Sequence, residues 1–230
     1  MVILAIIPSI IIFIIIWRFD TVEKEPAGLL AKLFAGGALT IISAVLIGLL
    51  GDKVMHHIFS SRTFAYLFIE CVILTALVEE GGKFLVLKFM TWKNKEFNYT
   101  FDGVVYATAV ALGFTIVENI IYVLRGDADN VAIRVLLMVT GNFIFAIFMG
   151  CFYGLARYEE GVGEDKAVIK HLAEAVIVPT AMHGFYVFCL RTEKPVFIIL
   201  FIIYDIIISF ITVKQFLKLS RNDTLIPGEE

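Results

Sequence analysis

The sequence has few charged residues and no long polar stretch. Only 18% of its 230 residues are charged and 60% are hydrophobic, with a mean hydropathy of +0.90. Soluble domains have about 25% charged and about 45–50% apolar residues. A water-soluble domain is therefore excluded, and the lipid bilayer is the expected environment. The near balance of 19 Lys and Arg against 22 Asp and Glu gives no indication of a nucleic-acid partner.

Cysteines are also few, and none lies in a disulfide-forming or metal-binding pattern. Cys71, Cys151 and Cys189 all lie within apolar runs, and there is no C-x-x-C pair. We interpret them as small buried hydrophobic residues. The first apolar run has no basic segment before it and no small-residue cleavage site after it. We therefore predict a membrane helix there and not a signal peptide.

The apolar residues are concentrated in seven long runs. A helix needs about 20 residues to cross the roughly 30 Å of hydrocarbon in a bilayer. Strands are not expected, because a membrane barrel alternates polar and apolar residues whereas these runs are continuously apolar. We predict a single membrane domain, residues 1–230, that is an all-α bundle with spans at about 2–18, 28–50, 64–90, 103–124, 132–156, 168–190 and 196–217.

Basic residues are distributed unevenly between the two ends of these spans. The connections after the first, third and fifth spans, together with the C-terminal tail, carry about twice as many Lys and Arg residues as the opposite side. Cytoplasmic loops carry such an excess. The sequence therefore predicts an N-terminus outside the cell and a C-terminus in the cytoplasm.

Several ionisable residues lie inside the predicted spans. Glu79, Glu80 and Lys83 lie in the third span, Glu118 in the fourth and His183 in the sixth. A charge near the centre of the bilayer costs roughly 2.5–3.5 kcal/mol on insertion scales. Such residues are retained where they pair or have a function. Both glutamates lie within one turn of Lys83, so a structural ion pair is one interpretation of the third span.

The predicted depths of these residues agree. With a rise of about 1.5 Å per residue and alternating helix directions, Glu118, Asn142 and His183 lie slightly outside the midplane, and the two glutamates lie near it. We therefore expect four helices to direct polar groups to one level of the bundle. Asn142 also has a simpler interpretation, as a hydrogen-bonding contact between helices.

The residue types favour hydrolysis by activated water. Two carboxyl groups in a site of low dielectric do not both ionise readily, so one can act as a base and the other as an acid. A nearby His, Asn or Lys can stabilise the oxyanion that forms. No H-E-x-x-H motif occurs, and no Ser or Cys nucleophile is paired with a histidine, so a covalent mechanism is less well supported.

Three motifs resemble those of a known family. They are Glu79-Glu80-Gly81-Gly82-Lys83, which matches E-E-x-x-K, Phe114-x-x-x-Glu118-Asn119, which matches F-x-x-x-E-N, and His183-Gly184. In combination, the sequence resembles the PrsW family of intramembrane proteases, which is distantly similar to the CAAX-processing and Abi endopeptidases.

The resemblance implies a glutamic-type intramembrane endopeptidase with no metal and no cofactor. Its implied catalytic residues are Glu79, Glu80, Glu118 and His183, and its implied supporting residues are Lys83, Phe114, Asn119 and Asn142. The implied substrate is a single-pass membrane protein, namely a membrane-anchored anti-sigma factor cleaved in a stress response.

Two positions depart from the family pattern, and three other interpretations stay open. The family often has a histidine where this chain has Asn142 and an acid where it has Val187. A proton- or ion-coupled transporter would also place ionisable residues in the membrane. A zinc-dependent protease would use Glu79, Glu118 and His183 as ligands. A purely structural membrane protein would not need this many buried ionisable groups.

Overall fold

The computed structural model describes residues 2–59, 61, 63–125, 131–192 and 194–228. These residues are almost entirely helical, and among them the only strand-like pairing is an isolated bridge between Tyr99 and Leu225. The predicted all-α class is confirmed. In chain order the elements are α1 (Val2–Phe19), α2 (Ala27–Ile58), α3 (Phe64–Ile69), the π-helix η1 (Glu70–Leu77), α4 (Val78–Thr91), α5 (Asp102–Leu124), α6 (Val131–Val162), α7 (Asp165–Arg191) and α8 (Pro195–Arg221).

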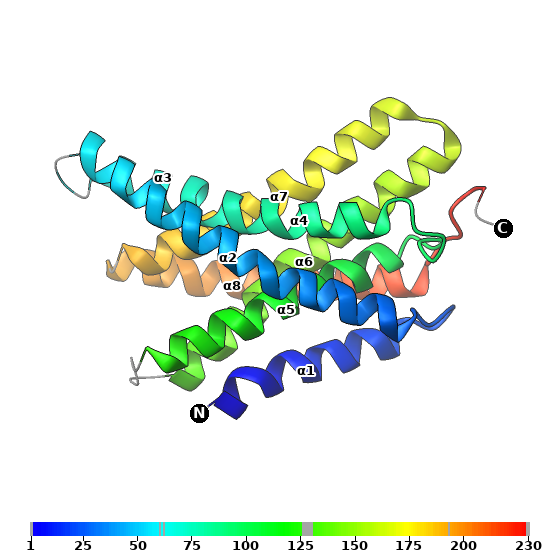
Figure 1. The fold of residues 1–230 in the computed structure, drawn as a ribbon, viewed down its shortest axis with the longest axis horizontal. Helices are drawn as coiled ribbons and strands as arrows, with labels where there is room; N and C mark the ends of the chain where they lie inside the picture. The colour runs from blue at the N-terminus through cyan, green and yellow to red at the C-terminus, as the bar shows by residue number, and fades with distance from the viewer. Residues whose placement is uncertain (1, 60, 62, 126–130, 193, 229–230) are drawn as a thin grey trace.

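The elements α3, η1 and α4 follow one another without a loop, so the described residues form seven helical rods (Figure 1). Five helices, α2, α5, α6, α7 and α8, are long and apolar enough to cross a membrane. The apolar part of α1, Ala5–Phe19, is shorter. The remaining rod is divided by its π-helical segment.

Two helices are longer than the predicted spans. The spans 28–50 and 132–156 correspond to α2 and α6, which continue to Ile58 and Val162. The additional turns carry charged residues such as Asp52, Lys53 and Arg157. Hydropathy marks the apolar part of a helix, which ends where charged residues begin. The helix itself can continue past that point, because its backbone hydrogen bonds do not require apolar side chains. The helices therefore extend beyond the predicted spans, which stay a prediction of the membrane-crossing part.

Helix α5 is the central helix of the bundle. All of its residues from Asp102 to Ile116 are buried, and α1, α2, α4 and α6 pack against it. By contrast, α2 and α8 have few buried residues and expose many Ile and Leu side chains, as expected for helices that face lipid. The polar residues of α5 are thereby kept away from the lipid-facing surface.

Two glycines allow α2 and α5 to approach each other backbone to backbone. A Cβ atom on Gly37 would lie 1.9 Å from the carbonyl oxygen of Val110, and one on Gly113 would lie 2.0 Å from that of Phe34. Both distances are far below van der Waals contact, so any side chain would push the helices apart. Small residues at such crossings are typical of helix packing in membranes.

We predict that Gly113→Ala destabilises the protein by about 1–3 kcal/mol, because the added methyl group separates α2 from α5. The matched control is Gly48→Ala, since a Cβ at Gly48 meets nothing within 4 Å. This control should be neutral, or stabilising by up to about 1 kcal/mol. Thermal unfolding in detergent measures both variants. Equal unfolding midpoints would contradict the close approach of the two backbones.

Candidate active site

The two glutamates lie in the first turn of α4, directly after the π-helix η1. A π-helix widens the backbone turn and changes the direction in which the next side chains point, and such segments occur often at functional sites. Helix α7 packs against η1 at Gly184, where a Cβ atom would lie 2.9 Å from Cγ2 of Val72. The absence of a side chain at Gly184 thus lets its neighbour His183 reach the glutamates.

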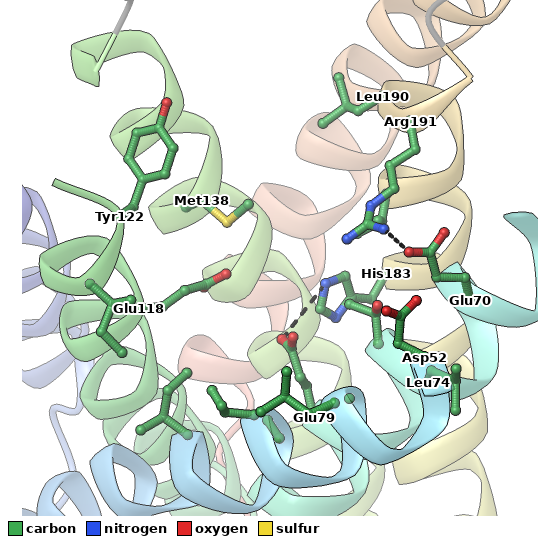
Figure 2. A pocket seen from close by; sticks show the side chains of 18 of the residues that line it. Asp52, Glu70, Leu74, Glu79, Glu118, Tyr122, Met138, His183, Leu190 and Arg191 are labelled. Atoms are coloured by element: carbon green, nitrogen blue, oxygen red, sulfur yellow. Dashed lines mark hydrogen bonds and ion pairs between the residues drawn. The ribbon is translucent and has the colours of Figure 1, made fainter. Parts of the chain in front are cut away.

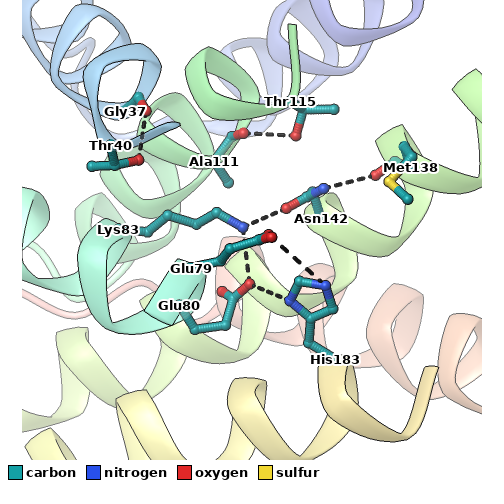
Figure 3. Close-up of polar contacts among 10 residues, drawn as sticks. All are labelled: Gly37, Thr40, Glu79, Glu80, Lys83, Ala111, Thr115, Met138, Asn142 and His183. Carbon is teal, nitrogen blue, oxygen red and sulfur yellow. Dashed lines mark hydrogen bonds and ion pairs between the residues drawn. The ribbon is translucent and has the colours of Figure 1, made fainter. Parts of the chain in front are cut away.

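A chain of buried polar groups connects three helices (Figure 3). Nζ of Lys83 lies 2.9 Å from Oε1 of Glu80 and also donates to Oδ1 of Asn142 on α6. Nδ1 of His183 lies 2.8 Å from the same Oε1 of Glu80. Asn142 in turn donates from Nδ2 to the carbonyl oxygen of Met138, at 3.1 Å. Glu80 is therefore held by a lysine and a histidine at once.

Aromatic rings complete the surroundings of this chain. The ring of Phe145 stacks on that of His183, with centroids 4.8 Å apart. Nζ of Lys83 lies 4.3 Å from the ring centroid of Phe114, within the range of a cation–π interaction. Glu80 and Lys83 are each only 1% exposed. The ion pair is therefore isolated from water and lipid, and its geometry is fixed by its neighbours.

Glu79 has a different environment from Glu80. Its side chain borders a cavity of about 640 Å³, which Glu80 does not line. Figure 2 shows Glu79, Glu118 and His183 directed toward one another across this cavity from α4, α5 and α7. Nε2 of His183 lies 4.0 Å from Oε2 of Glu79. Oε2 of Glu118 is buried and has no hydrogen-bond partner among the described residues. Both carboxylates are thus available to a bound molecule.

The structure brings together most of the residues that the sequence motifs indicated. Glu79, Glu118 and His183 border the cavity, and Glu80, Lys83, Asn142 and Phe114 form the support described above. Asn119 is buried, but its Nδ2 has no hydrogen-bond partner among the described residues. Val187 lies on the cavity wall, where an acid would face His183.

Some residues near the site carry no signal in the sequence alone. Phe145 stacks on His183, but it is one of 21 phenylalanines and forms no motif. Arg125, Arg134 and Arg191 line the cavity together with Glu70, whose Oε1 accepts from Arg191. These residues come from different helices, so their proximity becomes known only from the packing of the helices.

A sequence model described as PrsW family intramembrane metalloprotease matches residues 25–213. The chain belongs to the PrsW family. Curated relatives named Protease PrsW occur in Clostridioides difficile (32% identical over 89% of this chain and 85% of the relative), Oceanobacillus iheyensis (29%, over 80% of each) and Bacillus subtilis (27%, over 80% and 79%). No solved structure matches the chain significantly.

PrsW membership confirms the predicted resemblance and favours the protease over the transporter interpretation. Together with the long apolar helices, it identifies the chain as a multi-pass membrane protease. The three motifs that carried the resemblance are also the segments that form the cavity and its support.

The family description raises the question of whether this PrsW cavity fits a metal ion. Glu79, Glu118 and His183 provide two carboxylates and an imidazole, a donor set that zinc accepts. Glu80 contacts Nδ1 of His183, as a carboxylate often does when the other nitrogen of a histidine binds a metal, and this leaves Nε2 facing the cavity. Among the described residues, the only group of acids and histidines with donor atoms within 4.8 Å of one another lies elsewhere. The donor types therefore fit, although Glu118 would have to move closer to the other two.

We predict that Lys83→Met destabilises the protein by about 3–5 kcal/mol, because it leaves the Glu80 carboxylate buried without its counter-ion. The double variant Glu80→Gln/Lys83→Met should be less destabilised, since it removes both charges. Thermal unfolding in detergent provides the comparison. The matched control is Lys170→Met, which breaks an exposed pair with Glu174 at 3.8 Å and should cost less than about 1 kcal/mol. A Lys83→Met variant as stable as this control would contradict a buried ion pair.

Proposed function

We propose that this PrsW-family protease is an intramembrane endopeptidase that cleaves a single-pass membrane protein with a water molecule activated by Glu79. The observation that carries the proposal is the different environment of the two adjacent glutamates. Glu79 borders the cavity beside His183, whereas Glu80 is held between Lys83 and His183 and does not border the cavity. Of these two adjacent glutamates, Glu79 is therefore the one placed to accept a proton from water in the cavity.

The lining of the cavity supports direct attack by water. Its described residues include no serine and no cysteine, and Thr75 makes no hydrogen bond with His183. In the proposed reaction Glu79 removes a proton from water while the water oxygen bonds to the carbonyl carbon. The tetrahedral intermediate then collapses as the C–N bond breaks, and a carboxyl group delivers a proton to the leaving amine. Glu118 faces the same space and can provide that second carboxyl group.

The buried chain of polar groups supports a positioning role for Glu80, Lys83 and Asn142 in this proposal. Since Nδ1 of His183 is held by Glu80, its Nε2 stays directed at Glu79 and at the developing oxyanion. Preorganised groups of this kind act most strongly where water is excluded. Glu80 therefore acts as a positioning residue in this proposal, in contrast to the catalytic role that the resemblance implied.

A metal-dependent form of the same reaction is the second candidate, favoured by the orientation of His183 and by the family description. Glu79, Glu118 and His183 would hold the ion. A bound zinc ion would lower the pKa of its water and polarise the carbonyl group. Purified protein freed of metal by a chelator distinguishes the two forms. Loss of cleavage that zinc restores establishes the metal-dependent form, and full activity in chelator establishes the metal-free form.

We predict that Glu79→Gln lowers cleavage of a tagged single-pass substrate in liposomes by at least about 100-fold, because the amide cannot accept the proton from water. The fold of the variant is checked by its unfolding midpoint. The matched control is Glu164→Gln, an exposed glutamate before α7, which should cleave like the wild type. Unchanged cleavage by a folded Glu79→Gln protein would overturn the assignment of the base.

The proposed substrate class follows from the membrane location of the cavity. The cavity is bordered by α2, η1, α4, α5, α6 and α7, which are mostly apolar helices. A substrate reaching it is therefore a membrane-embedded segment. The family resemblance further indicates a membrane-anchored anti-sigma factor, whose cleavage would release a sigma factor.

We predict that helix-breaking residues near the cut accelerate cleavage. The peptide groups of a helix are hydrogen-bonded and shielded, so a substrate helix must unwind before water attacks its carbonyl carbon. Substrates with a Gly-Pro pair within one turn of the cut should be cleaved faster than those with Leu-Leu there. The same pair placed three turns away is the control. Equal rates for all three substrates would contradict the need for unwinding.

A further inference from the structure

A second group of acids lies where α5 begins, at the other end of this helix from Glu118. Asp20 follows α1, Asp102 is the first residue of α5, and Asp223 follows α8. One carboxylate oxygen from each lies within 4.8 Å of the other two. In Figure 1 this is the right-hand end, where the α1–α2 connection, the segment before α5 and the C-terminal tail meet.

Asp20 and Asp102 are buried and Asp223 is partly buried, and none of the three forms an ion pair among the described residues. Asp20 and Asp102 are each only 1% exposed. Oδ2 of Asp20 is buried without any hydrogen-bond partner in the described part of the chain. The nearest lysine, Lys24, directs its Nζ to the backbone carbonyl oxygens of Trp17 and Asp20 and forms no ion pair with the described acids. The negative charge of this end is therefore poorly compensated.

The neighbouring backbone fixes two of the carboxylates. Oδ2 of Asp102 accepts from the backbone N–H of Tyr99 at 2.7 Å and from that of Asn98 at 3.1 Å. Oδ1 of Asp223 accepts from the backbone N–H of Phe101 at 2.8 Å and that of Thr224 at 3.0 Å. In each carboxylate one oxygen is thus anchored by backbone donors, and this fixes the orientation of the carboxylate.

A further glutamate adds to the acidic character of this end. Glu25 is 5% exposed, interacts with Asp102 and accepts a hydrogen bond from the hydroxyl of Tyr106. Burial raises the pKa of Asp20 to about 6 and that of Glu25 to about 7. Leaving these carboxylates charged and unpaired is therefore costly, and either protons or a cation must compensate them.

We propose that Asp20, Asp102 and Asp223 together bind one hard divalent cation, calcium or magnesium. The three donors are all carboxylate oxygens, which these ions prefer, and there is no sulfur or imidazole among them to favour zinc. Oxygens bound to one calcium ion at about 2.3–2.6 Å lie at most about 5 Å apart, in agreement with the observed grouping within 4.8 Å. The cation would also provide a partner for Oδ2 of Asp20, which has none among the described residues.

The proposed ion differs in position and task from any metal in the cavity. Asp102 and Glu118 lie on the same helix, 16 residues and therefore about 24 Å apart. The ion would join three segments that are distant in the sequence: the start of the α1–α2 connection, the start of α5 and the tail after α8. Its task is to hold this end of the bundle together, and the chemistry of the cavity does not require it.

Thermal unfolding of the full-length Glu79→Gln protein in detergent tests the proposal, since this background weakens metal binding in the cavity. After treatment with chelator, calcium or magnesium chloride is added in increasing amounts. When the free cation concentration is 100-fold above Kd, the unfolding midpoint should have risen by about 5–10 °C. Further additions should raise the midpoint only slowly. Asp20→Asn and Asp223→Asn should remove this rise. The matched control is Asp165→Asn, an exposed acid at the start of α7, which should retain it.

Terbium luminescence provides a readout that does not depend on the stability of the variants. Tyr99 and Tyr106 lie beside the acids and should sensitise a bound terbium ion, which calcium then displaces. Absence of saturable terbium binding to the folded Glu79→Gln protein would overturn the proposal, as would unchanged binding by Asp223→Asn. Stabilisation by Asp20→Asn without any effect of cations would show that protons compensate these acids.

Discussion

The arrangement of the site depends on one buried ion pair, between Glu80 and Lys83. In a bundle of apolar helices neither charge is tolerated alone, so the pair must stay together and keep its hydrogen bonds. Its remaining bonds go to Asn142 on α6 and His183 on α7, and it thereby sets the relative positions of three helices. A structural need, the compensation of charge in a medium of low dielectric, thus also orients the histidine that faces the cavity.

The central helix α5 contributes the other half of the site. Gly37 and Gly113 allow α2 and α5 to pack backbone to backbone, which keeps α5 surrounded by protein over most of its length. Glu118 lies toward the far end of this helix, at the point where complete burial gives way to partial burial. It therefore faces a cavity and not lipid. Along α5, a small residue such as Gly113 allows close packing against α2, and the acid Glu118 follows where the helix borders the cavity.

The sequence predicted the helices and the convergence of charges more reliably than it predicted individual roles. Long apolar runs determine the number of helices, because lipid requires every backbone group to be paired internally. Spacing along one helix also indicated that both glutamates reach Lys83. It gave no means of separating Glu79 from Glu80, since that depends on the π-helix before them and on the approach of α7 at Gly184. The stacking of Phe145 on His183 and the isolation of Asn119 likewise depend on packing between helices.

The chain contains three kinds of buried carboxylate, and they differ in how their charge is compensated. Glu80 has a lysine at 2.9 Å, so its charge is compensated within the bundle. Glu79 and Glu118 face a cavity without such a partner, so their compensation must come from whatever enters it: a proton, a water molecule, a substrate or a metal ion. Asp20 and Asp102 are buried and Asp223 beside them is partly buried, without a cation from the described part of the chain, so these three acids resemble the cavity acids in this respect. Burying an acid without a partner lowers stability, so its presence in a membrane bundle indicates binding where no side chain provides the counter-charge. If both proposals hold, the two ends of α5 would each bind a partner, a reactant at one end and an ion that joins helix ends at the other.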